Sequence, residues 1–171
     1  MRRVILLRHA KSSWDDPSLI DQDRPLARRG RKDAPRMGKF LRRAGLIPDA
    51  VLCSSARRAR DTWSLVAEKL DQAPEPAIEE GLFMAAPRRL LARLRRLDDA
   101  FETVLMVGHN PGLEALAAGL AGSGKTGLLA TLKTKFPTAT VAVVDLPVDH
   151  WKDVAFGMGE LVAFVRPGDL D

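Results

Sequence analysis

Two short apolar runs, far apart in the chain, each lead into a histidine. Val4–Leu7 runs directly into Arg8 and His9. Thr103–Val107 runs through a single glycine into His109. Runs of this length and composition are typical of buried strands. Because ligands bind outside the carboxyl ends of the strands in open α/β sheets, we expect the two histidines to share one site.

Length and composition bound the class of protein. The 171 residues are 46% hydrophobic and 29% charged, as in ordinary globular proteins. No apolar run approaches the roughly 20 residues that a membrane-spanning helix needs, and the run after Arg3 is too short for a signal peptide. We therefore expect one domain over residues 1–171, located in the cytoplasm, with no membrane partner. The single cysteine, Cys53, allows no internal disulfide and is expected to be a buried core residue.

Strand-like and helix-like segments alternate along the chain. This alternation predicts an α/β fold with a mostly parallel sheet, covered by helices on both faces. Short turns between the last strands predict an antiparallel edge. Ser54 or Ser55 is expected to cap the second helix and Asn110 the fourth, and Gly122–Lys135 is expected to be a loop with at most one helical turn. We expect strands at residues 4–7, 50–53, 78–80, 103–107, 140–145, 153–156 and 161–165, and helices at about 27–44, 55–70, 87–97 and 111–120.

The segment Gly119–Thr126 matches the spacing of a nucleotide-binding P-loop. Such a loop needs a strand before it and a helix after it, so that backbone amides can surround the phosphates. The preceding residues 113–120 have the apolar spacing of a helix instead. No later strand ends in an aspartate suited to magnesium. We therefore interpret the segment as a surface loop that follows a helix.

The net charge of +5 raises the question of nucleic-acid binding. The arginines between residues 88 and 96 alternate with leucines at helical spacing, which is typical of the solvent-exposed face of an amphipathic helix. No nucleic-acid-binding motif accompanies them, and the chain contains no tyrosine for base stacking. We therefore expect anionic substrates rather than nucleic acid.

A third strand end supplies further positive charge. Arg57 and Arg58 follow the run at residues 50–53. Guanidinium groups bind phosphate oxygens in a bidentate manner, and an imidazole can attack phosphorus to give a covalent intermediate. The helix after His109 would add free amides and its positive dipole end. The three strand ends together predict a site for a transferring phosphoryl group, whereas the isolated His150 is expected to have no catalytic role.

These residues resemble the motifs of the histidine phosphatase superfamily, also called the phosphoglycerate-mutase-like group. Leu7–Ala10 resembles its signature, with alanine where many members have glycine. Arg58–Thr62 resembles the second-arginine motif, in a register that selects Arg58 over Arg57. Val107–Pro111 resembles the second-histidine motif. The segments Asp21–Leu26, Leu82–Pro87 and Phe136–Ala139 are similar to the SixA-type phosphohistidine phosphatase branch.

The resemblance implies a three-layer sandwich and a phosphatase that hydrolyses phosphohistidine on protein, with no metal or organic cofactor. It implies that His9 attacks phosphorus and carries the phosphoryl group. Arg8, Arg58 and His109 would hold the phosphoryl oxygens. The implied partner is a phosphorylated protein of the histidine phosphotransfer type or a small phosphate ester. A small-molecule phosphomonoesterase and a non-catalytic phosphate- or phosphoprotein-binding module are the alternatives, and the oligomeric state is left open.

Three further residues have two interpretations each. Ser12 matches a position near the phosphate pocket in some relatives, or it is a loop hydroxyl. Arg24 lines the mouth of the site, or it pairs with Asp21 or Asp23. Glu80 lies near the place where many members of the superfamily have a general acid, or it is a solvated carboxylate. A phosphoramidate substrate needs such an acid less, because imidazole leaves more easily than an alkoxide.

Overall fold

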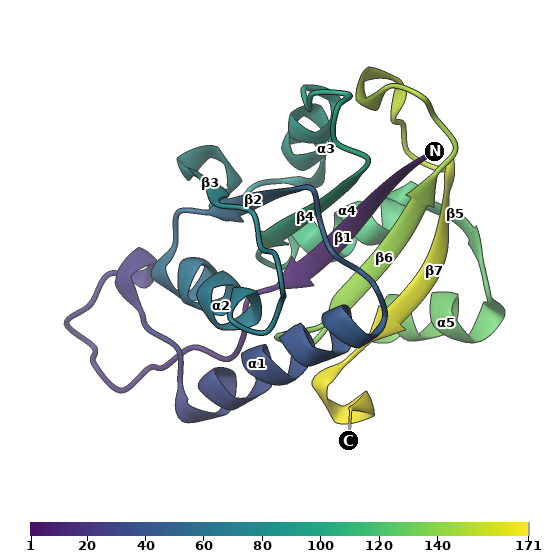
Figure 1. Cartoon of the computed structure of the whole chain (residues 1–171). Helices are drawn as coiled ribbons and strands as arrows, with labels where there is room; N and C mark the ends of the chain where they lie inside the picture. The colour runs from purple at the N-terminus through teal and green to yellow at the C-terminus, as the bar shows by residue number, and fades with distance from the viewer. Residues whose placement is uncertain (171) are drawn as a thin grey trace.

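A computed structural model describes residues 1–170, which form one seven-stranded sheet in the order β3-β2-β4-β1-β6-β7-β5 (Figure 1). The strands β1, β4, β2 and β3 are mutually parallel. β6 runs antiparallel to both β1 and β7, and β5 is parallel to β7. The expected mostly parallel sheet with an antiparallel part is confirmed. The strands are β1 (Arg2–Arg8), β2 (Ala50–Ser54), β3 (Pro76–Glu79), β4 (Thr103–Gly108), β5 (Ala121–Gly124), β6 (Val141–Leu146) and β7 (Gly159–Val165).

Helices cover both faces of this sheet (Figure 1). One core layer joins the sheet to Met37 and Leu41 of α1 and Trp63 of α2. The other joins it to α3, α4 and α5, for example through Leu94 and Leu116. The expected three-layer α/β sandwich is therefore confirmed. The helices are α1 (Arg28–Arg43), α2 (Arg57–Ala67), α3 (Pro87–Arg95), α4 (Gly112–Leu120) and α5 (Thr126–Thr134), with short 3-10 turns η1 (Asp21–Asp23), η2 (Glu80–Leu82), η3 (Trp151–Asp153) and η4 (Pro167–Asp169).

The central strand β1 is buried on both faces. Val4 and Leu6 pack into one core layer, and Ile5 and Leu7 pack into the other. All four side chains are completely buried. A strand that is buried on both faces has a continuous apolar sequence rather than an alternating one. This is why the strand can be predicted from the sequence.

The expectation of a loop over Gly122–Lys135 is wrong. Residues Ala121–Gly124 form β5, which pairs with β7, and α5 follows. β5 carries none of the β-branched or aromatic residues that mark a strand, because its backbone packs closely against a neighbouring chain segment. A Cβ atom on Gly122 would lie 1.9 Å from the carbonyl oxygen of Gly157.

The glycines of the P-loop-like segment are explained by this packing. A Cβ atom on Gly119 would meet the ring of Phe156 at 2.8 Å, and Gly124 has a φ of +152°. The helix α4 precedes the segment, as expected, but the segment is not the expected surface loop, because its glycines lie at the end of α4 and within β5. The segment thus lacks the strand–loop–helix order in which backbone amides surround a phosphate.

The strand expected at residues 153–156 is also wrong. Trp151 begins the 3-10 turn η3, and its side chain is completely buried. Its indole N–H donates to the carbonyl oxygen of Phe101, and its backbone N–H donates to the carboxylate of Asp99. These side-chain contacts fix the segment without any pairing to the sheet. Among the helices of residues 1–170, none combines the length and the apolar character that crossing a bilayer requires.

Candidate active site

The carboxyl ends of β2, β4 and β1 lie side by side at one edge of the sheet, because these strands are neighbours and parallel. The backbone N–H of His9, just after β1, donates to the carbonyl oxygen of Gly108 at 3.1 Å. The rings of His9 and His109 have centroids 5.1 Å apart and are tilted by 51°. The structure therefore brings the two histidines together, although they are far apart in the chain.

Arg58 reaches the same place from the first turn of α2. Its side chain is buried, whereas the side chain of Arg57 is 51% exposed and pairs with Asp61. The hydroxyl of Thr62 donates to the carbonyl oxygen of Arg58 at 2.7 Å and accepts the backbone N–H of Ala10 at 2.9 Å. This hydroxyl links α2 to the segment that contains His9. The register that selects Arg58 over Arg57 agrees with this burial.

Three buried nitrogen atoms of this cluster have no hydrogen-bond partner within residues 1–170. They are Nε of Arg8, Nε of Arg58 and Nδ1 of His109. Buried polar groups are nearly always paired, so an unpaired group in a native structure needs an explanation. Two guanidinium N–H groups and one imidazole nitrogen in a single cluster suit an anion with several oxygens, such as a phosphoryl group.

The local contacts of His9 determine which ring nitrogen can act as a base. Its Nδ1 lies 2.7 Å from the carbonyl oxygen of Ala10, which can only accept a hydrogen bond. Burial lowers the pKa of His9 to about 3, although this hydrogen bond acts in the opposite direction. The ring is therefore neutral near pH 7, with its proton on Nδ1 and a lone pair on Nε2.

His109 is oriented by Ser54, the last residue of β2. The Ser54 Oγ lies 2.7 Å from Nε2 of His109 and accepts the backbone N–H of Ala56 at 3.2 Å. The hydroxyl proton is then available to Nε2, which leaves Nδ1 of His109 as a donor. Burial, and next the charge of Arg58, lower the pKa of His109 to about 4.

The expectation that Ser54 or Ser55 caps the second helix is wrong. The helix α2 follows Ala56 with no side-chain cap, because Ser54 still belongs to the strand and its hydroxyl contacts His109. The expected cap by Asn110 is only partly present. Its Oδ1 accepts the N–H of Glu114 at 3.3 Å, and α4 begins at Gly112.

Arg8 is held by the loop that precedes β6. Its Nη1 donates to the carbonyl oxygen of Phe136 at 3.0 Å, and Nδ2 of Asn110 donates to the same oxygen at 2.9 Å. The backbone N–H of Ala139 contacts the carbonyl oxygens of Arg8 and His9, both at 3.1 Å. Ala139 has a φ of +59°, which is uncommon for a residue with a side chain. The loop Phe136–Ala139 therefore fixes the backbone on which Arg8 and His9 stand.

Asp21 joins Arg24 to the cluster. Its carboxylate accepts Nε of Arg24 and Nη2 of Arg58, both at 3.0 Å, and its backbone oxygen accepts Nη1 of Arg58 at 2.7 Å. Partial burial acts to raise the pKa of Asp21, but the hydrogen bonds and charges of the two arginines hold it below its usual value. Of the two acidic partners expected for Arg24, the structure has Asp21. The guanidinium of Arg24 also lies 3.5 Å from the ring centroid of Trp14, an exposed residue.

Ser12 and Glu80 lie outside this network of contacts. Ser12 is buried and pairs with Leu26 in an isolated antiparallel bridge. Glu80 is exposed, and its Oε1 accepts Nε2 of Gln22 at 3.1 Å. Gln22 also donates to the hydroxyl of Ser55 at 2.6 Å, so side-chain contacts of Gln22 link η1 both to η2 and to the segment between β2 and α2.

Two other residues from the sequence analysis lie away from the cluster. Cys53 is buried in β2, as expected for a core residue, and burial raises the pKa of its thiol to about 12. His150 is half-exposed, and its Nδ1 lies 2.9 Å from the carboxylate of Asp99.

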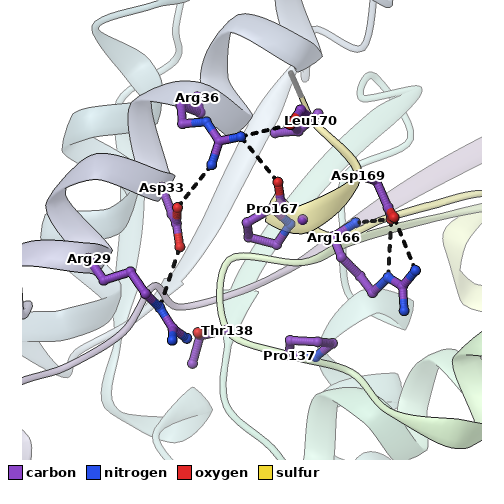
Figure 2. Close-up of a pocket in the computed structure, with 10 residues that line it drawn as sticks. Arg29, Asp33, Arg36, Pro137, Thr138, Arg166, Pro167, Asp169 and Leu170 are labelled. Atoms are coloured by element: carbon purple, nitrogen blue, oxygen red, sulfur yellow. Dashed lines mark hydrogen bonds and ion pairs between the residues drawn. The ribbon is translucent and has the colours of Figure 1, made fainter.

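A separate cavity of about 610 Å³ is lined by Pro137 and Thr138 of the loop Phe136–Ala139, together with residues of α1 and η4 (Figure 2). Its arginines are engaged by neighbouring groups. Arg36 contacts Asp33 at 3.2 Å and also donates to two backbone oxygens of the C-terminal turn. Arg166 forms a bidentate ion pair with Asp169, in which Nε and Nη2 of Arg166 donate to the two carboxylate oxygens at 3.1 and 3.0 Å. We interpret these contacts as a structural connection between α1 and η4.

Comparisons with known proteins show the family of this chain. Residues 4–83 match the family described as the histidine phosphatase superfamily (branch 1). An uncharacterized protein of Mycobacterium tuberculosis is 42% identical over 163 residues, which cover 94% of this chain and 99% of the relative. An uncharacterized chloroplastic protein of Arabidopsis thaliana is 31% identical over 163 residues, covering 89% and 70% respectively.

Two solved structures show the same fold along almost the whole chain. A SixA protein of Nakamurella multipartitia superposes with a TM-score of 0.84 and 28% identity, covering 97% of this chain and 96% of that one. A SixA protein of Agrobacterium tumefaciens superposes with a TM-score of 0.80 and 29% identity, covering 97% and 98%. The fold and the converging strand ends define a member of the histidine phosphatase superfamily, to which this chain belongs. Within the superfamily it is of the SixA type.

Proposed function

We propose that this protein removes the phosphoryl group from phosphohistidine on a protein, through a covalent intermediate on His9. The observation that carries the proposal is the state of His9. It is a buried neutral imidazole whose Nδ1 is bound by the carbonyl oxygen of Ala10, and it stands beside unpaired nitrogen atoms of Arg8, Arg58 and His109. The two SixA proteins of known structure, which bear the name phosphohistidine phosphatase, support the same substrate class.

In the first step, the lone pair on Nε2 of His9 attacks phosphorus. A bond between Nε2 and phosphorus forms while the bond from phosphorus to the substrate imidazole breaks. The leaving nitrogen keeps the electron pair and takes up a proton from solvent. Arg8, Arg58 and Nδ1 of His109 would hold the phosphoryl oxygens, and donors placed in this way typically contribute about 10²–10³-fold each.

In the second step, water attacks the phosphohistidine on the enzyme. A phosphorus–oxygen bond forms, the bond to Nε2 of His9 breaks, and inorganic phosphate leaves. Nε2 recovers its lone pair, one proton of the water molecule stays on the phosphate, and the other goes to solvent or to a second phosphate oxygen. Nδ1 of His9 keeps its hydrogen bond to Ala10 in both steps, so the ring holds one orientation throughout.

A small-molecule phosphomonoesterase of the same superfamily is the second candidate function. Hydrolysis of an ester needs an acid that protonates the leaving oxygen, and Glu80 is the candidate for this acid. The exposed carboxylate of Glu80 contacts Gln22 and makes no hydrogen bond to Arg8, His9, Arg58 or His109 among the described residues. This position favours a substrate with a better leaving group, such as phosphohistidine.

The deciding experiment measures release of phosphate from a phosphohistidine protein and from a panel of sugar and nucleotide phosphates. We expect kcat/KM to be highest for the phosphohistidine protein. Efficient hydrolysis of an ester, with no activity on any phosphohistidine protein, would favour the phosphomonoesterase. Stoichiometric phosphate binding without turnover of any substrate would favour a non-catalytic binding module.

A further inference from the structure

A groove of about 490 Å³ lies along α3, next to the candidate active site. Leu82 and Ala92 contribute to its apolar lining, and four arginines border it. Two consecutive residues, one in the groove and one at the cluster of Arg58 and His109, connect the groove to the candidate active site. Leu82 lines the groove, while the ring of Phe83 packs edge-on against His109 at 5.4 Å and lies 5.8 Å from the guanidinium of Arg58.

The positive charge of the groove is only partly neutralised. Arg93 forms a bidentate ion pair with Glu79, in which Nε and Nη2 of Arg93 donate to the two carboxylate oxygens at 2.8 and 2.9 Å. The exposed side chains of Arg88, Arg89 and Arg96 have no acidic partner within residues 1–170. This distinguishes the groove from the cavity in Figure 2, where Arg36 and Arg166 are paired with aspartates.

The placement of Arg88 and Arg89 costs the helix stability. Both lie in the first turn of α3, which contains no acidic residue. A helix N-terminus carries a partial positive charge, so cations there are unfavourable. Real proteins break such local rules at functional sites. These two arginines also lie at the end of α3 that follows β3, near the carboxyl edge of the sheet where His9 stands.

We propose that this groove binds an acidic segment of the phosphorylated protein substrate, beside its phosphohistidine. The inference rests on the proposed function and specifies which phosphoproteins the enzyme selects. The occupant is a polypeptide, because the groove lies along α3 and shares no lining residue with the cluster that would hold the phosphoryl group, so one ligand must extend from one to the other. Its chemistry is set by three unpaired guanidinium groups above an apolar floor, which complement carboxylates spaced along a peptide.

The test uses three synthetic peptides that each contain one phosphohistidine, flanked by glutamates, glutamines or lysines. We expect kcat/KM to fall in that order, by about tenfold at each step at low ionic strength. The preference for the acidic peptide should lie in KM and should weaken as salt is added, because exposed charges are screened within about 10 Å at 0.1 M salt. Equal kcat/KM values for the three peptides would overturn the proposal.

The diagnostic variant is Arg88→Glu/Arg89→Glu. Acidic residues suit a helix N-terminus, so this variant should unfold at the same or a higher temperature than the wild type. We expect it to reverse the order of the peptides while hydrolysis of a small phosphoramidate is retained. The matched control is Arg42→Glu/Arg43→Glu, an equal change of charge at the exposed C-terminal end of α1. If both variants lose the preference equally, the effect is one of net charge and the groove is excluded.

Two binding measurements, with an acidic peptide and with a DNA oligonucleotide, test the groove independently of the proposed enzymatic activity. If no phosphohistidine peptide is hydrolysed, the proposed function fails. Fluorescence anisotropy of an unphosphorylated glutamate-rich peptide then tests the groove by itself, with loss of binding expected in Arg88→Glu/Arg89→Glu. A single-stranded DNA oligonucleotide that competes for Arg88 and Arg89 more strongly than the acidic peptide would assign the groove to nucleic acid and overturn the inference.

Discussion

The Nδ1 atom of His9 lies 2.7 Å from the carbonyl oxygen of Ala10. Because that oxygen can only accept, the proton of the neutral ring stays on Nδ1 and the lone pair on Nε2 is left for attack on phosphorus. We expect rapid-quench experiments with labelled substrate to trap an acid-labile, base-stable phosphoryl adduct on His9. His9→Ala should form no adduct and show no turnover. Full activity in this variant would contradict the assignment.

Arg58 and Arg57 are adjacent in sequence but differ in environment. The side chain of Arg58 is 4% exposed, and its unpaired Nε lies in the cluster, whereas the side chain of Arg57 is 51% exposed. We expect Arg58→Ala to lower kcat/KM by about 10²–10³-fold, because a charge-assisted contact in the transition state is lost. Arg57→Ala should change it by less than about threefold, since exposed ion pairs contribute little. Equal losses in steady-state assays of both variants would refute the assignment.

Ser54 is a positioning residue for His109. Its hydroxyl fixes Nε2 of His109 and so presents Nδ1 to the cluster. We expect Ser54→Ala to lower kcat about tenfold with little change in KM, because a misoriented donor weakens stabilisation of the transition state. Ser54→Thr, which keeps the hydroxyl, should recover most of the loss. A fall in thermal stability with unchanged kcat would show that the role of Ser54 is only structural.

Burial of the two neutral histidines makes stability depend on pH. Their pKa values are lowered to about 3 and about 4 in the folded state, against about 6.5 when unfolded. At pH values between the folded and the unfolded pKa, the unfolded chain binds more protons than the folded protein. The free energy of unfolding therefore decreases as the pH falls below 6.5. From pH 7.5 to 5.5 each histidine should contribute about 1.4 kcal/mol of destabilisation.

Urea unfolding at the two pH values measures this effect. We expect the wild type to lose about 2–3 kcal/mol of unfolding free energy between pH 7.5 and 5.5. His9→Gln/His109→Gln should lose far less, because glutamine does not titrate. A wild-type value that is independent of pH over this range would mean that the histidines are protonated without penalty.

Glu80 tests how far the site depends on a side-chain acid. Because Glu80 is exposed and contacts Gln22, we expect Glu80→Gln to change hydrolysis of neither phosphohistidine nor an ordinary phosphate ester, and we expect native ester activity to be low. General acid catalysis typically contributes about 10²–10⁴-fold. If Glu80→Gln slows ester hydrolysis by such a factor and leaves phosphohistidine hydrolysis unchanged, Glu80 is the general acid of this site.

Some elements can be predicted from the residues alone because a single local cause fixes them. β1 and β4 are buried on both faces, so their sequences are continuous apolar runs, and α3 has leucines on one face and arginines on the other. β5 could not be predicted in this way. Its glycine-rich sequence has no strand character of its own, and only pairing with β7 and contact with Gly157 make it a strand.

The sequence by itself determined that Arg8, His9, Arg58 and His109 lie at or shortly after the carboxyl ends of strands, because the apolar runs and the motif spacing are local properties of the chain. Only the tertiary structure decided which atoms meet. The partnership of Ser54 with His109 spans 55 positions, and that of Arg58 with Asp21 spans 37. Hydrogen bonds act over about 3 Å and depend on angle. They become defined only when packing of the sheet and helices places these distant segments at one edge.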